Sequence, residues 1–258
     1  TFTIPISTSS GRGGFSPSLT LQYSTGNGNG PFGLGWNLGI PSVTRKTDKG
    51  LPRYNDDDVF VISGAEDLVP VEAGFPLGNG STARGAYMVR QYRPRVEGLF
   101  ACIERWTRTI SVGGVARRDE HWRVVSKDNI TSLYGRTDNA RIADPYNSER
   151  VFQWLLQETF NSKGNHVLYE YAQDDAAQLP TEIYEEHRTA SQRYVRRIFY
   201  GNLPSAIPLT HPDGSAIGVS RQASDPADPS RTIRRRYSLE IVFDYGDWQL
   251  PFDLSLEQ

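Results

Sequence analysis

The stretch FGLGWNLGI, residues 32–40, places a large apolar side chain at every second position. This period of two is typical of a β-strand, in which successive side chains point to opposite faces of a sheet. One face of such a strand would be almost bare, because glycine or asparagine stands at each intervening position. A face of glycines lets a second backbone or an aromatic ring approach closely. We therefore expect residues 32–40 to form one strand wedged between packed layers.

The residues before this stretch predict a reversal of the chain. Leu19, Leu21 and Tyr23 alternate with polar residues, as in a half-buried strand. The run GNGNGP, residues 26–31, then supplies residues that tolerate positive φ and favour turns. We treat seven residues of this turn and of the following strand as a structural signature, namely Gly28, Gly30, Pro31, Phe32, Gly33, Gly35 and Trp36.

The rest of the chain repeats the strand pattern between frequent turn signals. Residues 151–160 and 166–171 flank the loop NSKGN and predict a hairpin. Further strand candidates are residues 59–62, 68–71, 86–92, 100–110, 122–126, 130–134, 194–200 and 237–245. The best helix candidate is residues 181–188, and residues 201–230 predict a long exposed loop. The sequence thus predicts an all-β protein of many short antiparallel strands in layered sheets, with little helix.

Length and composition exclude several classes of protein. The 258 residues carry a formal net charge of −2, which argues against nucleic-acid binding and against binding to anionic membranes. Cys102 is the only cysteine, so the chain can form neither an internal disulfide nor a cysteine-based zinc site. No apolar run approaches the roughly 18 residues that a membrane-spanning helix requires, so we expect no direct membrane insertion. The chain starts at Thr1 without a visible signal peptide, and we expect a fragment of a longer chain.

Two short motifs have a more ordinary interpretation than a catalytic one. Residues 28–33, GNGPFG, fit the G-x-G-x-x-G pattern of dinucleotide-binding folds, but a strand pattern follows where the phosphate-binding helix should begin. Residues 7–9, Ser-Thr-Ser, resemble the strand motif of one class of ADP-ribosyltransferases. That chemistry also needs a Glu-x-Glu pair, which the chain lacks. We interpret the first motif as a turn and the second as a polar segment.

Candidates for a nucleophile, a general base or a metal ligand are sparse. Cys102 lies in an apolar strand candidate, where a thiol is usually inert. Residues 55–58, Asn-Asp-Asp-Asp, lack the ligand spacing of a calcium loop and are interpreted as a solvated acidic turn. The histidines are scattered, at His121, His166, His187 and His211. We therefore predict no catalytic, cofactor-binding or metal-binding residue. A hydrolase with a triad assembled from distant residues stays open as an alternative.

Arginine dominates the basic residues, with 24 of the 28. Clusters occur at residues 193–197 and 231–236, but carboxylates match them in number across the chain. We expect these arginines to pair with Asp or Glu inside a large β assembly, or at a subunit interface.

Longer blocks of the sequence resemble a known family. Residues 4–24 and the block GNGPFGLGW, residues 28–36, resemble the start of the Salmonella virulence plasmid B protein (SpvB) family. Residues 45–54 and 63–71 are similar to the B component of bacterial Tc insecticidal toxin complexes. Residues 164–171, GNHVLYEY, resemble the Gly-Asn…Tyr-x-Tyr unit of Rhs/YD repeats. Further matching blocks follow in family order at residues 134–137, 141–145, 193–202 and 242–246.

The resemblance implies a single β domain over residues 1–258 that forms part of a Rhs/YD-like shell wall and needs no cofactor. In Tc toxins the B and C components together enclose the toxic part of C, and another part of B docks on the pore-forming A component. The implied partners are therefore the C component and, through other parts of the full chain, the A component, in a secreted bacterial complex. A rival within the family is the amino-terminal region of an actin-modifying ADP-ribosyltransferase.

Overall fold

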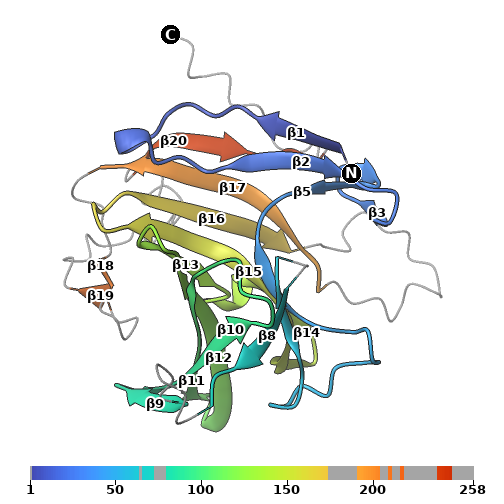
Figure 1. Ribbon diagram of the computed structural model, residues 1–258, viewed down its shortest axis with the longest axis vertical. Helices are drawn as coiled ribbons and strands as arrows, with labels where there is room; N and C mark the ends of the chain where they lie inside the picture. The colour runs from blue at the N-terminus through green and yellow to red at the C-terminus, as the bar shows by residue number, and fades with distance from the viewer. Residues whose placement is uncertain are drawn as a thin grey trace.

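The computed structural model describes residues 2–63, 66–72, 80–173, 191–203, 209–210, 216–217 and 237–245. Strands form nearly all of its regular structure, and the helical segments in these residues are two short 3-10 turns, Arg12–Gly14 and Asp138–Ala140. The expected all-β class with little helix is confirmed (Figure 1). The helix candidate at residues 181–188 lies outside the described residues.

Eight antiparallel strands close into a ring (Figure 1). The path of hydrogen-bonded neighbours runs from β13 to β15, and β15 pairs again with β13 to complete the circle. In order around the ring the strands are β13 (Ile130–Tyr134), β12 (Val115–Val125), β11 (Cys102–Val112), β10 (Tyr87–Pro94), β8 (Glu66–Pro70), β7 (Phe60–Ile62), β6 (Ser42–Arg45) and β15 (Asn147–Asn161). Closure removes the free edges that an open sheet would expose.

The long strand β15 links the ring to an open sheet. Leu155 and its neighbours pair with β6, whereas Glu158 to Phe160 pair with β16. The sheet continues outward through β16 (His166–Gln173), β17 (Arg193–Asn202) and β20 (Tyr237–Val242). Two further strands flank this framework, β14 (Arg141–Asp144) on β15 and β9 (Ser81–Arg84) on β10.

Aromatic side chains fill the interior of the ring. Phe60 of β7 and Trp122 of β12 have ring centroids 4.9 Å apart, although three strands separate β7 from β12 around the ring. The contact therefore crosses the interior. Tyr92 and Trp154 complete the group, with centroid distances to Trp122 of 4.9 and 6.1 Å. Edge-on and tilted contacts of this kind add to the stability gained by burial.

A second, smaller sheet packs on the open sheet. It contains β1 (Phe2–Ile6), β2 (Leu19–Tyr23) and β5 (Trp36–Leu38), all antiparallel. Leu19 and Leu38 are buried in the same apolar cluster as residues of β16 and β17, and Leu239 of β20 packs against that cluster. The expectation of layered sheets is therefore confirmed here. The remaining strands form two small pairs, β3 (Asn29–Gly30) with β4 (Gly33–Leu34), and β18 (Leu209–Thr210) with β19 (Ala216–Ile217).

Most strand predictions are confirmed, with shifted ends. Residues 151–160 and 166–171 form the expected hairpin as β15 and β16. The expected strand at 122–126 begins earlier, because Gly113 and Gly114 have φ of +59° and +82° and join β11 to β12 in a tight hairpin. Residues 201–202 belong to β17, and most of the expected loop at 201–230 lies outside the described residues.

The prediction of one wedged strand over residues 32–40 is wrong. Gly33 and Gly35 have φ of +98° and +80°, so the chain turns twice and forms β4 and β5 instead. As a result Leu34 is 74% exposed, whereas Leu38 is 6% exposed. The reversal expected in residues 26–31 is confirmed, because β5 runs antiparallel to β2. The close approach expected at a bare glycine is also confirmed, since a Cβ on Gly35 would lie 2.5 Å from the ring of Tyr23.

We predict a graded response to alanine at three signature glycines. Gly35→Ala should lower the free energy of unfolding by about 2 kcal/mol or more, because the positive φ and the clash of the new Cβ with Tyr23 act together. Gly33→Ala should lower it by about 1 kcal/mol, since Gly33 has positive φ but a Cβ there would meet no atom within 4 Å. Gly28→Ala is the matched control, with neither feature. Urea unfolding measures the three values, and equal losses at Gly28 and Gly35 would contradict this account.

Candidate functional site

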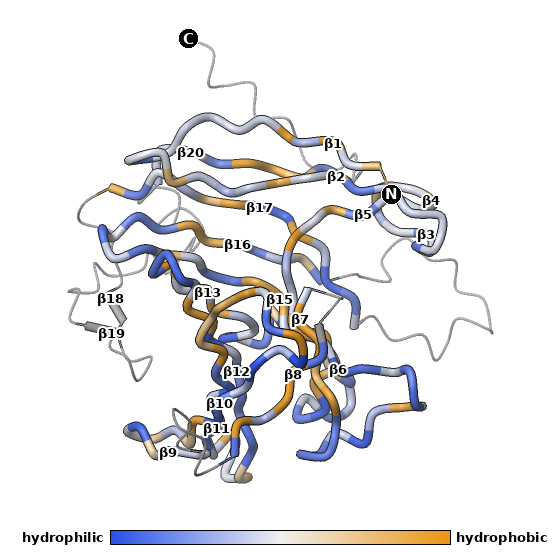
Figure 2. Tube along the Cα trace, in the orientation of Figure 1, coloured by the Kyte–Doolittle hydropathy of each residue, from blue (hydrophilic) through white to orange (hydrophobic). Residues whose placement is uncertain are grey.

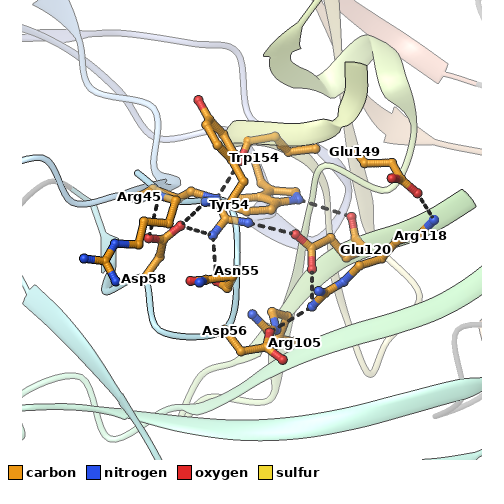
Figure 3. Close-up of polar contacts among 12 residues, drawn as sticks. Arg45, Tyr54, Asn55, Asp56, Asp58, Arg105, Arg118, Glu120, Glu149 and Trp154 are labelled. Carbon is orange, nitrogen blue, oxygen red and sulfur yellow. Dashed lines mark hydrogen bonds and ion pairs between the residues drawn. The ribbon is translucent and has the colours of Figure 1, made fainter. Parts of the chain in front are cut away.

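A chain of paired charges, partly buried, lies where the connection between β6 and β7 folds back against the ring (Figure 3). Arg45, the last residue of β6, is 3% exposed. Its Nε donates to the backbone oxygen of Val151 at 2.8 Å, and its Nη1 donates to Asp58 Oδ2 at 2.7 Å. Its Nη2 lies 3.3 Å from Glu120 Oε1. Arg45 therefore joins β6, β12, β15 and the connecting loop.

Three aromatic rings surround the guanidinium group of Arg45. Its guanidinium carbon lies 5.3 Å from the ring centroid of Tyr54, 5.0 Å from that of Phe60 and 5.3 Å from that of Trp154. Such cation–π contacts favour a charge that has left water. The indole Nε1 of Trp154 also donates to the backbone oxygen of Glu120 at 3.2 Å. Aromatic packing and charge pairing thus meet at one residue.

Asp58 anchors the connecting loop to Arg45. Its carboxylate accepts hydrogen bonds from the backbone N–H groups of Arg53 at 2.9 Å and Tyr54 at 2.7 Å. The side chain of Asp58 is only 9% exposed. The interpretation of residues 55–58 as a solvated acidic turn is therefore wrong at Asp58, although residues 46–59 are mostly hydrophilic in sequence (Figure 2).

The chain of charges continues across the ring from Glu120. Glu120 Oε2 lies 3.3 Å from Arg118 Nη2, and Arg118 Nη2 lies 3.0 Å from Asp56 Oδ1. Arg105 Nη2 donates to the same Asp56 oxygen at 2.6 Å. We call this set the Arg45 network, which contains Arg45, Asp56, Asp58, Arg105, Arg118 and Glu120. Its three arginines and three carboxylates cancel in charge.

Burial and pairing set the protonation of this network. Burial lowers the pKa of Arg45, and the negative charges of Glu120 and Asp58 oppose that shift. Burial acts to raise the pKa of Asp56, but the hydrogen bond from Arg118 and the charge of Arg105 outweigh it and bring the pKa to about 2. Asp56 therefore remains a carboxylate at any physiological pH.

The geometry of the network suits a structural role. Each carboxylate faces arginine, so none is poised to accept a proton from a substrate. Residues 2–63, 66–72 and the other described ranges contain no group of three or more His, Cys, Asp or Glu side chains that could hold a metal ion. Within the same ranges no helix has the length and apolarity needed to cross a bilayer.

The candidate nucleophiles do not gather at the network. Burial, followed by the charge of Glu104, raises the pKa of the Cys102 thiol, which disfavours the reactive thiolate. His121 is 3% exposed and stacks on Trp106 at a centroid distance of 6.0 Å. Burial and the charges of Arg136 and Arg141 lower the pKa of His121 to about 3, so the ring is neutral at neutral pH. His187 and His211 lie outside the described residues.

His166 takes part in a separate buried contact. Its Nδ1 meets the hydroxyl of Tyr237, and its Nε2 lies 3.4 Å from Glu158 Oε2. His166 is 3% exposed and Glu158 is 9% exposed, and Glu158 also pairs with Arg136 at 3.5 Å. This contact joins β15, β16 and β20.

The signature residues lie away from the Arg45 network, at the small sheet. Phe32 packs against Tyr245 at a centroid distance of 6.0 Å, and Trp36 packs against Tyr23 at 5.2 Å. Gly28, Gly30, Pro31, Gly33 and Gly35 shape the β3–β4 hairpin and its exit. Their standing as a structural signature stays a prediction.

Sequence reasoning did not identify the Arg45 network. The available signal was limited to Arg105, which stands beside Trp106 in the strand candidate at 100–110. In the cluster at residues 193–197 the expected pairing of arginine with carboxylates is confirmed at Arg197, which lies 3.2 Å from Glu240, but not at Arg193, which has no ion pair among the described residues. The same pairing occurs outside the clusters at Arg45, Arg105 and Arg118. The arginine cluster at residues 231–236 lies outside the described residues.

Comparison with known proteins gives consistent matches along the chain. A family model described as "Salmonella virulence plasmid 65kDa B protein" matches residues 1–253. The mono(ADP-ribosyl)transferases SpvB of Salmonella typhimurium strain 14028s / SGSC 2262 and of Salmonella dublin are each 34% identical over 256 residues. Each alignment covers 95% of this chain and 39% of the relative. The chain therefore spans about two fifths of the length of these relatives.

Solved structures share the fold. The N-terminal domain of effector protein SpvB from Salmonella typhimurium strain LT2 matches with a TM-score of 0.71 and 30% identity, over 89% of this chain and 75% of that one. The Photorhabdus luminescens Tc holotoxin pore matches with a TM-score of 0.75 and 29% identity, over 95% of this chain and 10% of that one. The TcdB2-TccC3 complex matches with a TM-score of 0.71 and 30% identity, over 94% of this chain and 11% of that one.

We predict that Arg45→Met lowers the free energy of unfolding by about 3–5 kcal/mol, because Asp58 would stay buried without its cationic partner and Glu120 would keep only Arg118. The double variant Arg45→Met/Asp58→Asn should lose less stability than the sum of the losses in the single variants Arg45→Met and Asp58→Asn. Arg12→Met, at an exposed arginine, is the matched control and should change stability by no more than about 0.5 kcal/mol. Urea unfolding measures all four proteins. A loss at Arg45 no larger than at Arg12 would show that the network is dispensable.

We also predict a pH dependence from His121. Its pKa is about 3 in the folded state and near its ordinary value when unfolded, so the unfolded chain binds the proton more tightly. Stability should therefore fall as pH drops from about 6.5 towards 3, by at most about 1.4 kcal/mol per pH unit from this residue. His121→Phe keeps the ring against Trp106 and should flatten that slope. Unfolding measured at pH 7.5 and about 4.5 tests this, and parallel losses in both proteins would refute it.

Proposed function

The chain belongs to the SpvB family, and from that premise we propose that it is a non-catalytic wall segment of a bacterial toxin shell. In this role it would build part of the β-shell that, with a C component, encloses a toxic effector. Delivery would proceed through a pore-forming A component contacted by other parts of the full protein. The proposal implies a secreted complex and requires no cofactor.

The similarity to much larger chains supports a wall role. The whole fold recurs, over 95% of this chain, as one tenth of a chain in the Tc holotoxin pore structure. A domain that recurs as a minor part of a large assembly is expected to contribute surface and stiffness. Buried arginine–carboxylate pairing agrees with that role.

The edge strands of the two sheets give the strongest support for the proposal. Among the described strands, β20 pairs only with β17, and β1 pairs only with β2. On β1 the side chains of Phe2, Ile4 and Ile6 are 61%, 41% and 38% exposed. Unpaired edges with exposed apolar side chains promote aggregation unless another strand or layer covers them. A continuous shell would supply that cover.

The runner-up function is the amino-terminal region of an SpvB-type ADP-ribosyltransferase. The 34% identity over 95% of the chain to SpvB proteins favours it. Under this alternative the present region would still be non-catalytic, and an activity on actin would reside elsewhere in the full polypeptide. The two candidates differ in their partner, because only the shell requires a C component.

The test is assembly of the full-length protein with its C component. We predict that Ile4→Lys/Ile6→Lys prevents a stable complex, because two charges enter the apolar row of β1. Thr3→Lys is the matched control, since Thr3 is exposed on the opposite face of the same strand. Urea unfolding confirms that the variants fold. Protease protection of the cargo reports closure of the shell.

Two results would contradict the proposal. The first is normal assembly and full protection of the cargo by the Ile4→Lys/Ile6→Lys variant. The second is failure of the wild-type full-length protein to bind any C component while it modifies actin, which would favour the runner-up.

A further inference from the structure

A polar pocket opens on the outside of the ring. It is separate from the edge strands β1 and β20. It has a volume of about 210 Å³ and is formed by β14, the start of β15, the end of β16 and the start of β17. Two register shifts interrupt the pairing of β14 with β15, between Ile142 and Ala143 and between Ala143 and Asp144. Bulges of this kind redirect side chains. Both Ala143 and Asp144 line the pocket.

The acidic side chains of the pocket already have cationic partners. Asp138 Oδ1 lies 3.1 Å from Arg141 Nη1 and 3.4 Å from Arg117 Nη2. Asp144 Oδ2 lies 3.4 Å from Arg150 Nη1, and Asp144 Oδ1 accepts a hydrogen bond from the backbone N–H of Tyr146 at 2.9 Å. Neither carboxylate is therefore available to bind a cation.

The buried cation of the pocket is also satisfied. Arg141 is 3% exposed, and its Nη2 lies 2.7 Å from Asp119 Oδ1. Its Nε donates to the backbone oxygen of Gly135. Arg141 thus holds the pocket wall in place and has little capacity left for a ligand.

Arg193 differs from these residues. Within the described ranges its guanidinium has no carboxylate partner, and its hydrogen bond is from Nη1 to the backbone oxygen of Gln192 at 3.3 Å. Partial burial lowers the pKa of Arg193, and the charge of Asp138 opposes that shift only in part. A partly desolvated guanidinium with no carboxylate within salt-bridge distance among the described residues keeps N–H donors for an anion.

Two serine residues line the same pocket as Arg193. They are Ser148 and Ser191, and no hydrogen bond engages either hydroxyl among the described residues. A guanidinium and two hydroxyls together offer directed N–H and O–H donors, which is the set that recognises the oxygen atoms of carboxylates and phosphates.

We infer that this pocket binds a small oxyanion, with Arg193 as the charged contact and Ser148 and Ser191 as hydrogen-bond donors. Carboxylates and phosphates share this chemistry. Asp138 and Asp144 in the wall disfavour a second negative charge, so a monocarboxylate should bind more tightly than the phosphate dianion. The inference is independent of the proposed function, because it needs neither a C component nor a shell.

The test is ligand-observed NMR on the full protein with acetate and with inorganic phosphate, each at constant ionic strength set by chloride. Saturable binding of acetate in the millimolar range, tighter than that of phosphate, is expected. Arg193→Gln should weaken acetate binding by roughly tenfold. Ser191→Ala should weaken it about threefold. Arg12→Gln removes the same charge from another exposed site and should leave binding unchanged.

Three outcomes would overturn the inference. These are equal binding by wild type and Arg193→Gln, equal loss in Arg193→Gln and Arg12→Gln, or no saturable binding of either anion by wild type up to about 10 mM. Thermal unfolding without ligand shows whether each variant is folded. If Arg193→Gln fails to fold, the Ser191→Ala variant and the preference for acetate over phosphate decide the question.

Discussion

The burial of Arg45 is the constraint on which the ring depends. A guanidinium that is 3% exposed must find its counter-charges inside the protein, and it finds them on the connecting loop at Asp58 and across the interior at Glu120. These contacts hold only if β6, β12 and β15 stand at fixed positions around the aromatic group. Breaking one partner leaves the others buried and charged, which is the costly alternative. Charge pairing therefore specifies how the ring closes.

Closure of the ring organises the rest of the molecule. Because β15 has 15 residues, it pairs with β6 and β13 and still extends far enough to begin the open sheet at β16. The small sheet of β1, β2 and β5 then covers one face of that open sheet. The result is a closed ring from which two packed sheets extend. A segment built in this way suits the proposed wall role, and the same fold recurs in the structure of the Photorhabdus luminescens Tc holotoxin pore.

Local patterns predicted much of the fold, because alternation of apolar residues reports directly on strands such as β2, β15 and β16. The same alternation was misleading at residues 32–40, where the φ angles of Gly33 and Gly35 turn the chain and no side chain marks that choice. Ring closure and the Arg45 network were beyond local reasoning. Glu120 lies 75 residues after Arg45, and only the completed topology brings the two together. The oxyanion pocket likewise joins residues from four strands.

The central claim is that this chain is a wall segment whose free borders are covered in the assembled protein. Hydrogen–deuterium exchange of the backbone amides in β1 and β20 tests it most directly, with the full-length protein measured alone and together with its C component. The account predicts that exchange in both border strands slows strongly in the complex, while the amides of the closed ring are slow in both states. Equal exchange of β1 and β20 with and without the partner would contradict it.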